Sequence, residues 1–498
     1  MGRKLLIVGA MSSAGKSLIC AGLCRIFRED GLRPAPFKAQ NMALNSAVTA
    51  DGRELSRSQY VQAQAAEAEP DARMNPILLK PMGDSRSQVV LCGREWGTLS
   101  AAEYYAQKRR FEPVIARCLQ ELSQRYDPIV MEGAGGAAEI NLYEKDLSNL
   151  YLARLTGAPA LLVGDIDRGG VFAQLYGTMM LLPPEDRRRI TGLIINKFRG
   201  DPAILQPGIR QLEEICGVPV LGVVPYVRHG VEEEDSLAPC LDNRAAGPGV
   251  DVAVIRLPRL ANFTDFAALS RRAGVTVRYV TRPGQLERAP DLLILPGSKN
   301  TLGDLAWLRQ TGLARRICAL AGAGAPVLGI CGGYQLLGRR VTDQAGAEGG
   351  GSAPGLGLLP VETDFVQEKR RTRTKGAFRV TGGFFSCLDG AAFSGYELHM
   401  GRTRRTSGAP LAALAGGGED GCVQGNVAGS YIHGLLDGAG ALTQLCRALR
   451  QRRGLPPEPP EETAPPEPAG DAIAPVAAAL RQSLDLPRIY RMMEEETT

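Results

Sequence analysis

The chain begins with an apolar strand that runs directly into a glycine-rich loop and then a helix. The strand covers residues 5–10, the loop reads Gly-Ala-Met-Ser-Ser-Ala-Gly-Lys-Ser over 9–17, and the helix is predicted for 18–27. This order is the P-loop arrangement, in which backbone N–H groups and a helix N-terminus bind phosphate. We therefore assign a nucleotide site in which Lys16 reaches the terminal phosphates and Ser17 ligates Mg²⁺. The other members of the site are Gly9, Ser12 and Gly15.

Further buried strands follow, each running into a polar or glycine-rich loop. They lie at 128–132, 160–165, 192–198 and 218–225, with helical segments of roughly 10 to 15 residues between them. This alternation predicts a parallel, doubly wound α/β sheet. Glu132 ends one of these strands, where a carboxylate is well placed for the Mg²⁺ of a nucleotide. Asn196 and Lys197 resemble the base-recognition motif of P-loop proteins, which makes Asn196 a predicted adenine contact.

Two polar stretches of this first region are candidates for substrate binding. Lys38, Gln40, Asn41 and Asn45 follow a strand that ends at residue 37. Open α/β sheets bind ligands at the carboxyl ends of their strands, so these side chains are predicted to face substrate, although an ordinary connecting loop would have the same composition. Asp146 either positions substrate carboxamides or metal, or belongs to a solvated loop.

Changes in composition divide the chain into four parts. An acidic and then Pro/Gly/Ala-rich stretch at about 228–249 reads as a linker. It separates a P-loop domain, predicted for 1–235, from a second strand series, predicted as a domain over 250–445. A Pro/Glu-rich linker is predicted for 454–470 and a helical tail for 471–498. Both domains are predicted to be doubly wound α/β.

The second domain carries a nucleophile candidate on a sharp turn. A buried strand over 326–330 leads to Cys331, two glycines and a helical pattern. This matches the strand–turn–helix logic of a nucleophile elbow, with sulfur in place of oxygen. His433, one of three histidines, ends a later strand-like run and is the candidate base. The alternative is a small buried cysteine in a glycine-rich turn, which the placement of His433 argues against.

Other groups are assigned around this pair. The backbone N–H groups of Gly297 and Gly332 are predicted to form an oxyanion hole. Asp437 and Glu397 are the two alternatives for a carboxylate that would orient the imidazole of His433. His399 is as consistent with a structural role as with a functional one.

Several motifs carry a family resemblance. Gly-Ile-Cys-Gly-Gly-Tyr-Gln at 329–335, with Tyr-Ile-His-Gly at 431–434, resembles the glutaminase domain of class I-type glutamine amidotransferases. The stretches 38–46, 260–266 and 295–301 resemble the cobyric acid synthase branch. The P-loop resembles that of dethiobiotin-synthetase-like proteins, where a Glu at the position of Glu132 holds Mg²⁺. Leu435 stands where the wider class has a triad Glu; the resembling branch also lacks it, which implies a Cys–His pair.

The resemblance implies a glutamine-hydrolysing, ATP-dependent amidoligase of cobalamin biosynthesis. It would amidate the b, d, e and g carboxylates of adenosylcobyrinic acid a,c-diamide to give adenosylcobyric acid. Its partners would be the corrinoid, glutamine and ATP with Mg²⁺, and no protein-bound prosthetic group is expected, since the cobalt belongs to the substrate. A corrin a,c-diamide synthase or a cell-wall glutamate amidase stays an alternative that residues 38–46 disfavour. A non-catalytic P-loop switch or partitioning ATPase is disfavoured by the Cys331 elbow.

Composition limits location and partners. The 498 residues carry a net charge of +5 without a basic block interleaved with aromatics, so nucleic acid is not an expected partner. No apolar run approaches the roughly 20 residues that span a bilayer, and no signal-peptide pattern is present, so a cytoplasmic enzyme with no membrane partner is expected. The cysteines show no metal-ligand spacing with histidine. The sequence leaves the oligomeric state open.

Overall fold

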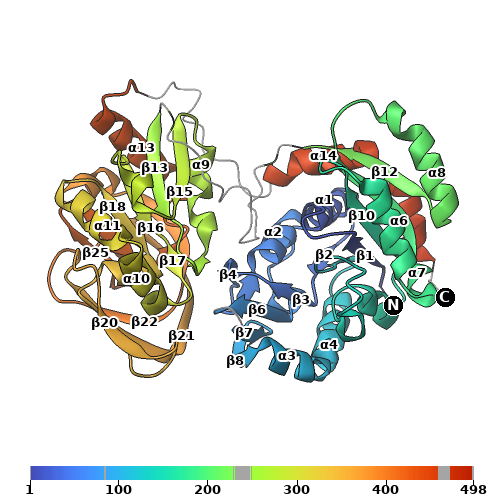
Figure 1. Ribbon diagram of the computed structural model, residues 1–498, viewed down its shortest axis with the longest axis horizontal. Coiled ribbons are helices and arrows are strands. Elements are labelled where there is room, and N and C mark those ends of the chain that lie inside the picture. The colour runs from blue at the N-terminus through green and yellow to red at the C-terminus, as the bar shows by residue number, and fades with distance from the viewer. Residues whose placement is uncertain are drawn as a thin grey trace.

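The computed structural model describes residues 2–82, 86–227, 229, 247, 249–457 and 471–495. The acidic part of the predicted first linker and most of the Pro/Glu-rich segment lie outside these residues. Figure 1 shows two domains, the P-loop domain with the chain N-terminus and the second domain beside it. Each domain has its own hydrophobic core, and each core is built on a mainly parallel sheet.

The P-loop domain is organised around a six-stranded parallel sheet. Its order is β12-β11-β10-β1-β9-β2, and every pairing is parallel. β1, β2, β9 and β10 are fully buried, as the strands of a sheet covered on both faces are expected to be, while the edge strand β12 is partly exposed. They are β1 (Lys4–Gly9), β2 (Ala35–Phe37), β9 (Ile129–Glu132), β10 (Ala160–Asp165), β11 (Ile190–Phe198) and β12 (Val220–Pro225). The helices are α1 (Lys16–Glu29), α2 (Arg57–Ala65), α3 (Ala101–Gln107), α4 (Glu112–Ser123), α5 (Leu150–Thr156), α6 (Val171–Leu181), α7 (Pro184–Arg187) and α8 (Gln206–Cys216).

The stretch between β2 and α3 adds two small sheets that the sequence analysis did not predict. One has the order β3-β6-β7-β8 and the other pairs β4 with β5. Their strands are β3 (Gln40–Met42), β4 (Ser46–Val48), β5 (Glu54–Ser56), β6 (Ile77–Pro81), β7 (Arg86–Leu91) and β8 (Arg94–Ser100). Figure 1 shows β4 and β6 on the side of this domain that faces the second domain.

The second domain contains a six-stranded sheet of order β15-β13-β16-β18-β26-β25. It is parallel except for its last strand, which pairs antiparallel with β26. The strands are β13 (Val250–Ile255), β15 (Val275–Val280), β16 (Leu292–Leu295), β18 (Val327–Ile330), β25 (Cys422–Gln424) and β26 (Val427–Ser430). The helices are α9 (Ala267–Arg271), α10 (Thr301–Gln310), α11 (Leu313–Gly322), α12 (Gly332–Leu337) and α13 (Ala439–Arg453), the last running beyond the predicted boundary at 445.

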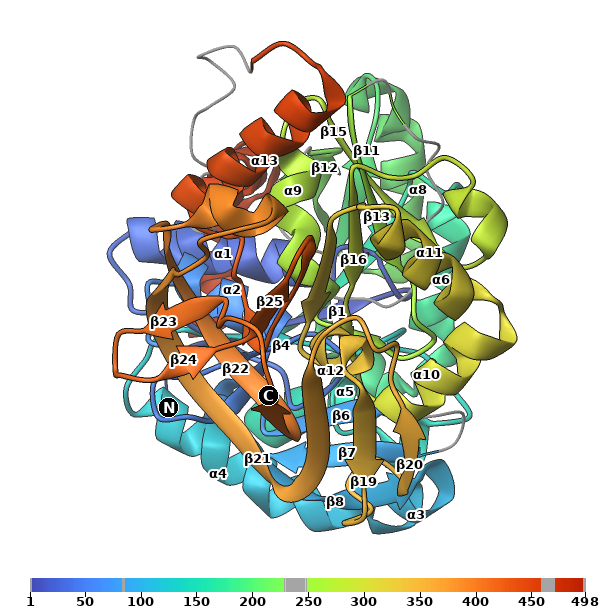
Figure 2. The ribbon, with the colours of Figure 1, turned by 90° about the vertical axis from the view of Figure 1, so that its left-hand side faces the viewer.

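A long antiparallel hairpin dominates a second sheet of this domain. Figure 2 shows its two strands in front of the parallel sheet. They are β21 (Val361–Phe378) and β22 (Ala392–Arg405), and β27 (Ile432–His433) pairs with β22. The other strands of this sheet are β19 (Arg340–Asp343), β20 (Gly351–Pro354), β23 (Ala412–Leu414) and β24 (Glu419–Asp420), while β14 (Leu260–Ala261) and β17 (Gly297–Ser298) pair in a separate two-stranded sheet. The sheet of the long hairpin brings His433 beside residues of β22.

The C-terminal tail returns to the P-loop domain. It forms α14 (Ala474–Ser483) and α15 (Leu486–Glu494), close to the predicted helices. Leu480 packs where a side chain at Gly22 of α1 would stand, and the Asp485 N–H donates to the carbonyl of Leu221 at 2.8 Å. The chain therefore begins and ends in the same domain (Figure 1).

Polar contacts join the two domains. A buried carboxylate, Glu54 of the P-loop domain, is paired with Lys80 of its own domain and with Lys369 of β21, whose Nζ lies 2.6 Å away. Burial alone would raise the pKa of Glu54, but Lys369 and Lys80 hold it well below its usual value. Two further contacts are Lys299 Nζ to Gln88 Oε1, 2.9 Å, and Arg373 Nε to the carbonyl of Val48, 2.9 Å.

Candidate active sites

Cys331 lies at the tip of a strained elbow between β18 and α12. Its φ of 52° and ψ of −109° are unfavourable for a residue with a side chain. The glycines after it are required, because a Cβ at Gly333 would collide with the carbonyl of Leu295. Backbone strain of this kind costs about 1–3 kcal/mol and concentrates at functional sites. The cysteine is buried, and its thiol lies 3.7 Å from the carbonyl oxygen of Leu398.

His433 faces Cys331 and is held by a carboxylate that the sequence analysis missed. Its Nδ1 lies 2.7 Å from Oδ2 of Asp265, whose Oδ1 accepts from the N–H of Gly434 at 3.0 Å. Both side chains are almost fully buried. Asp265 therefore fixes the orientation of the imidazole and leaves Nε2 for the sulfur, which is the arrangement of a Cys–His–Asp triad.

The charge state of His433 follows from its neighbours. Burial by itself would lower the pKa of His433, but the Asp265 carboxylate and the Cys331 sulfur outweigh it and raise that pKa to about 10. At neutral pH the imidazole therefore holds its proton beside the sulfur. An acid therefore stands next to the sulfur of the candidate nucleophile.

Asp265→Asn should lower the pKa of His433 from about 10 toward its ordinary value. The reason is that the carboxylate stabilises the imidazolium, so its loss lets the ring deprotonate at lower pH. Nuclear magnetic resonance titration of labelled histidine measures this directly, since the chain has three histidines. Asp437→Asn serves as the matched control and should shift the His433 titration much less. A larger shift in the Asp437 variant would show that Asp437 is the orienting carboxylate.

The backbone around the sulfur offers donors for an oxyanion. Gly332 approaches the neighbouring β17 so closely that a Cβ there would lie 2.6 Å from the backbone nitrogen of Ser298. Gly297 lies next to Ser298 in the same strand, and a Cβ added to it would lie 3.6 Å from Cε1 of His433. The two predicted glycines thus flank the Cys331–His433 pair, where an oxyanion would need N–H donors.

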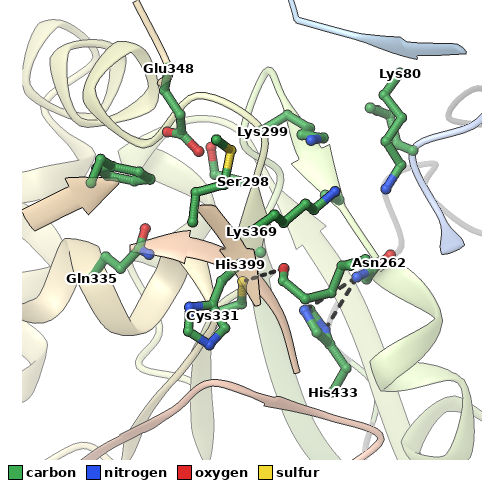
Figure 3. A pocket seen from close by; sticks show the side chains of 16 residues that line it. Lys80, Asn262, Ser298, Lys299, Cys331, Gln335, Glu348, Lys369, His399 and His433 are labelled. Carbon is green, nitrogen blue, oxygen red and sulfur yellow. Dashed lines mark hydrogen bonds between the residues drawn. The ribbon is translucent and has the colours of Figure 1, made fainter. Parts of the chain in front are cut away.

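A cavity opens beside these residues at the domain interface. Figure 3 shows Cys331, His433 and Ser298 on one side of it and Lys80 of the P-loop domain on the other. Leu44, also of the P-loop domain, lines the same cavity. A molecule bound at Cys331 is therefore enclosed by both domains.

Glu397, one of the two carboxylates left open from sequence as the partner of His433, contacts other side chains. Glu397 instead accepts from Nε2 of His399 at 3.1 Å and pairs with Arg370 at 2.8 Å. His399 also stacks on Tyr431, with ring centroids 3.6 Å apart, while still lining the cavity. The carboxylate that contacts the imidazole of His433 is Asp265, 168 positions away in sequence, in place of Glu397.

The P-loop has the shape that its sequence predicts. Lys16 lies at the start of α1, and its Nζ donates to the carbonyls of Met11 and Gly135 at 3.1 and 2.8 Å. A Cβ at Gly9 would lie 2.8 Å from that Nζ, so glycine leaves room for the lysine. Burial, followed by repulsion from Lys38, lowers the pKa of Lys16 to about 8. A phosphate bound next to Nζ would favour the charged ammonium form of Lys16.

Glu132, at the end of β9, is the centre of a buried polar network. Its Oε1 accepts from Ser17 Oγ and from Lys38 Nζ, both at 2.7 Å. Its Oε2 accepts from the side-chain amides of Gln59 and Gln62 at 3.2 and 2.6 Å. Burial would raise the pKa of Glu132, but Lys38 and the hydrogen bonds lower it, so the carboxylate stays ionised. The structure thus brings Ser17, Lys38 and Glu132 together and adds two glutamines that no local pattern indicates.

The other predicted nucleotide-site residues lie around the same loop. Asn196, near the end of β11, donates to the carbonyl of Ala14 at 2.9 Å and so braces the loop. Gly15 has a φ of +99° and packs against this amide. Ser12 is exposed at the loop surface.

The remaining substrate candidates take separate positions. Gln40 accepts from the Tyr104 hydroxyl at 2.7 Å. Asn41 donates at 3.3 Å to Gln59, a member of the Glu132 network. Asn45 is fully buried, and its Oδ1 accepts from the N–H of Phe263 in the other domain at 3.1 Å. Asn45 therefore contacts the second domain directly. Asp146 caps α5 by accepting from the N–H groups of residues 148, 149 and 151.

The described ranges lack two features, a membrane-spanning helix and a cluster of metal-ligating side chains. No helix there is both long and apolar enough to cross a membrane. No group of three or more His, Cys, Asp and Glu side chains within those ranges is arranged to hold a metal ion. A divalent ion at Ser17 and Glu132 would therefore need further ligands from a bound phosphate or water.

Comparison with known proteins finds matches to both domains. Residues 5–237 match the CobQ/CobB/MinD/ParA nucleotide binding domain, and residues 251–441 match the CobB/CobQ-like glutamine amidotransferase domain. A cobyric acid synthase of Ruminiclostridium cellulolyticum is 48% identical over 99% of this chain and 98% of its own length. One of Photorhabdus laumondii is 48% identical over the same shares, and a probable cobyric acid synthase of Methanocella arvoryzae is 47% identical over 100% and 99%. With relatives this similar along its whole length, the chain belongs to the cobyric acid synthase family.

Proposed function

We propose that the protein uses glutamine and ATP to amidate the b, d, e and g carboxylates of adenosylcobyrinic acid a,c-diamide, giving adenosylcobyric acid. The proposal rests on one observation: a single chain holds both a P-loop site and a Cys331–His433–Asp265 site, and both of its domains line the cavity at Cys331. The similarity to curated cobyric acid synthases supports the corrinoid as the substrate.

In the first half-reaction, Cys331 hydrolyses glutamine. The thiolate attacks the side-chain amide carbon, and the oxyanion is stabilised by N–H groups near Gly297 and Gly332. His433 gives its proton to the departing ammonia, which leaves a thioester. The neutral imidazole then takes a proton from water, which attacks the thioester and releases glutamate. Asp265 keeps the ring oriented through both steps.

In the second half-reaction, ATP activates a substrate carboxylate. The carboxylate oxygen attacks the γ-phosphorus, ADP leaves, and an acyl phosphate forms. Ammonia then attacks the acyl carbon and displaces phosphate, which gives the amide. Lys16 supports the first step by balancing the charge on the phosphates, and the backbone N–H groups of the loop hold them in place.

Mg²⁺ fits the residues at the P-loop. The Ser17 hydroxyl lies 2.7 Å from a Glu132 oxygen at the end of β9, and both are the hard oxygen donors that Mg²⁺ prefers. When bound with the nucleotide, the ion would neutralise phosphate charge. Lys38 donates to the same Glu132 oxygen, so it would have to yield part of this contact or share it.

Glu132→Gln should slow amide synthesis from glutamine and from ammonia, because a neutral amide ligates Mg²⁺ poorly and leaves Lys38 without its buried counter-charge. If ligation is its role, raised Mg²⁺ should restore part of the rate. Steady-state synthesis over a Mg²⁺ titration measures this, with Glu185→Gln, an exposed carboxylate on α7, as the matched control. An unchanged Mg²⁺ dependence in the Glu132 variant would remove it from the metal site.

The stoichiometry of the reaction tests the proposed function. We expect one ADP, one phosphate and one glutamate for every amide formed from the a,c-diamide, with ammonium able to replace glutamine. Coupled assays of ADP and glutamate, read against product by chromatography, give these ratios. Glutamate formed without amide in the presence of all substrates would contradict the proposal.

A further inference from the structure

Two side chains besides Asp265 contact the imidazole of His433. The Nδ2 of Asn262 lies 3.2 Å from Nε2 and 3.4 Å from Nδ1, as the dashed lines in Figure 3 show. The ring of Tyr396, which is opposite His433 in the β22–β27 pairing, stacks on the imidazole with centroids 5.2 Å apart. The proposed mechanism gives neither side chain a task.

Both of these side chains also bind the backbone of one residue of the other domain, Ser46. The N–H of Ser46 donates to Oδ1 of Asn262 at 3.1 Å, and the hydroxyl of Tyr396 donates to the carbonyl of Ser46 at 2.9 Å. Ser46 starts β4 of the P-loop domain. The N–H and the carbonyl of Ser46 are therefore both hydrogen-bonded to side chains that contact the imidazole of His433.

Ser46 is itself firmly held. The Ser46 hydroxyl donates to Glu54 at 2.8 Å and accepts from Lys80 at 2.7 Å, and all three side chains are buried. The preceding residue, Asn45, accepts from the N–H of Phe263, the residue after Asn262. These hydrogen bonds fix the segment of the P-loop domain that contacts Asn262.

The hydrogen bond from Ser46 also determines which end of the Asn262 amide faces His433. Because the Ser46 N–H is a donor, the oxygen of the amide must face it, and the NH₂ group must therefore face the imidazole. This NH₂ group can donate to Nε2 only while Nε2 is unprotonated, as in the step where the neutral imidazole takes a proton from water. The backbone of Asn262 is left-handed, with φ of 52°, a conformation that asparagine tolerates better than most residues. Without Ser46, the amide would be able to turn and present its oxygen instead.

We propose that Asn262 and Tyr396 are positioning residues that hold His433 for glutamine hydrolysis. The backbone of Ser46 sets the positions of both side chains. The glutaminase site is therefore complete only when the P-loop domain is docked against it. This inference rests on the proposed roles of Cys331 and His433. It means that the site releases ammonia efficiently only where the domain that consumes ammonia is in place.

Two variants of the full-length protein separate positioning from packing. Tyr396→Phe keeps the ring on His433 but removes the bond to Ser46, and Asn262→Gly removes the amide while tolerating the left-handed backbone. We expect kcat with glutamine to fall about fivefold for Tyr396→Phe, the effect of one hydrogen bond of ordinary strength, and about fiftyfold for Asn262→Gly. KM for glutamine and synthesis from ammonium should stay within about twofold of the wild-type values, since neither side chain acts at the P-loop.

The controls distinguish the possible failures. Tyr60→Phe removes another hydroxyl contact between the domains, to Arg373 at 3.5 Å, without touching His433, and should leave kcat with glutamine unchanged. Wild-type kcat with glutamine in both Asn262→Gly and Tyr396→Phe would overturn the inference, as would an equal loss of ammonium-dependent synthesis. Cys331→Ala is assayed in parallel. If that variant still used glutamine, the proposed glutaminase site would be wrong, whatever the other variants did.

Discussion

Cys331→Ala should reduce glutamine-dependent synthesis by about four orders of magnitude or more, because no thioester can form without the sulfur. Synthesis from high ammonium at raised pH should persist, since NH₃ attacks the acyl phosphate and the P-loop site has no chemical need of the thiol. His433→Ala should give the same separation, because His433 transfers protons only during glutamine hydrolysis at Cys331. Product formation with glutamine and with ammonium chloride, with ADP followed in parallel, measures both halves.

The matched control for this prediction is Cys387→Ala, which removes a half-buried thiol elsewhere in the second domain. It should use both nitrogen sources normally. Appreciable glutamine use by Cys331→Ala would show that another residue is the nucleophile. Loss of ammonium-dependent synthesis in a folded Cys331→Ala protein would show that the two sites are coupled more tightly than separate chemistry requires.

Lys16→Ala should reduce synthesis from both nitrogen sources by about a thousandfold, because its ammonium balances phosphate charge as the acyl phosphate forms. Glutamine hydrolysis measured alone should be affected less, since Lys16 lies at the P-loop and does not line the Cys331 cavity. ADP release and glutamate release, measured side by side, report the two effects. Near-normal synthesis from ammonium in Lys16→Ala would contradict the assignment of the P-loop as the ATP site.

The fold class could be predicted because its signals are local. Apolar strands that run into glycine-rich loops, as at Gly9 and Cys331, predict parallel α/β sheets, and the structure confirms two of them. The long hairpin of β21 and β22 lies within the predicted second domain, but its strands lack this local signal. Its 18-residue first strand carries many exposed charged residues, so it lacks the buried apolar pattern that marks the core strands.

The parts of the site that sequence could not predict depend on contacts between distant segments. Asp265 reaches His433 across 168 positions, and its segment had been noted for its family resemblance without a chemical role. Asn45 was expected to face substrate, because it follows a strand end, yet it binds the backbone of Phe263 across the domain interface. Gln62 joins Glu132 from a helix whose sequence carries no nucleotide-binding motif. Spacing along the chain cannot indicate such pairs, since only tertiary packing brings them together.

The most direct test of the account is mass spectrometry of the product formed from adenosylcobyrinic acid a,c-diamide with Mg²⁺, ATP and glutamine labelled with ¹⁵N in its side-chain amide. The account predicts a corrinoid in which all four remaining carboxylates have become ¹⁵N-labelled amides, with none formed when ATP is omitted. A corrinoid recovered without added amides, although glutamine and ATP are both consumed, would contradict it.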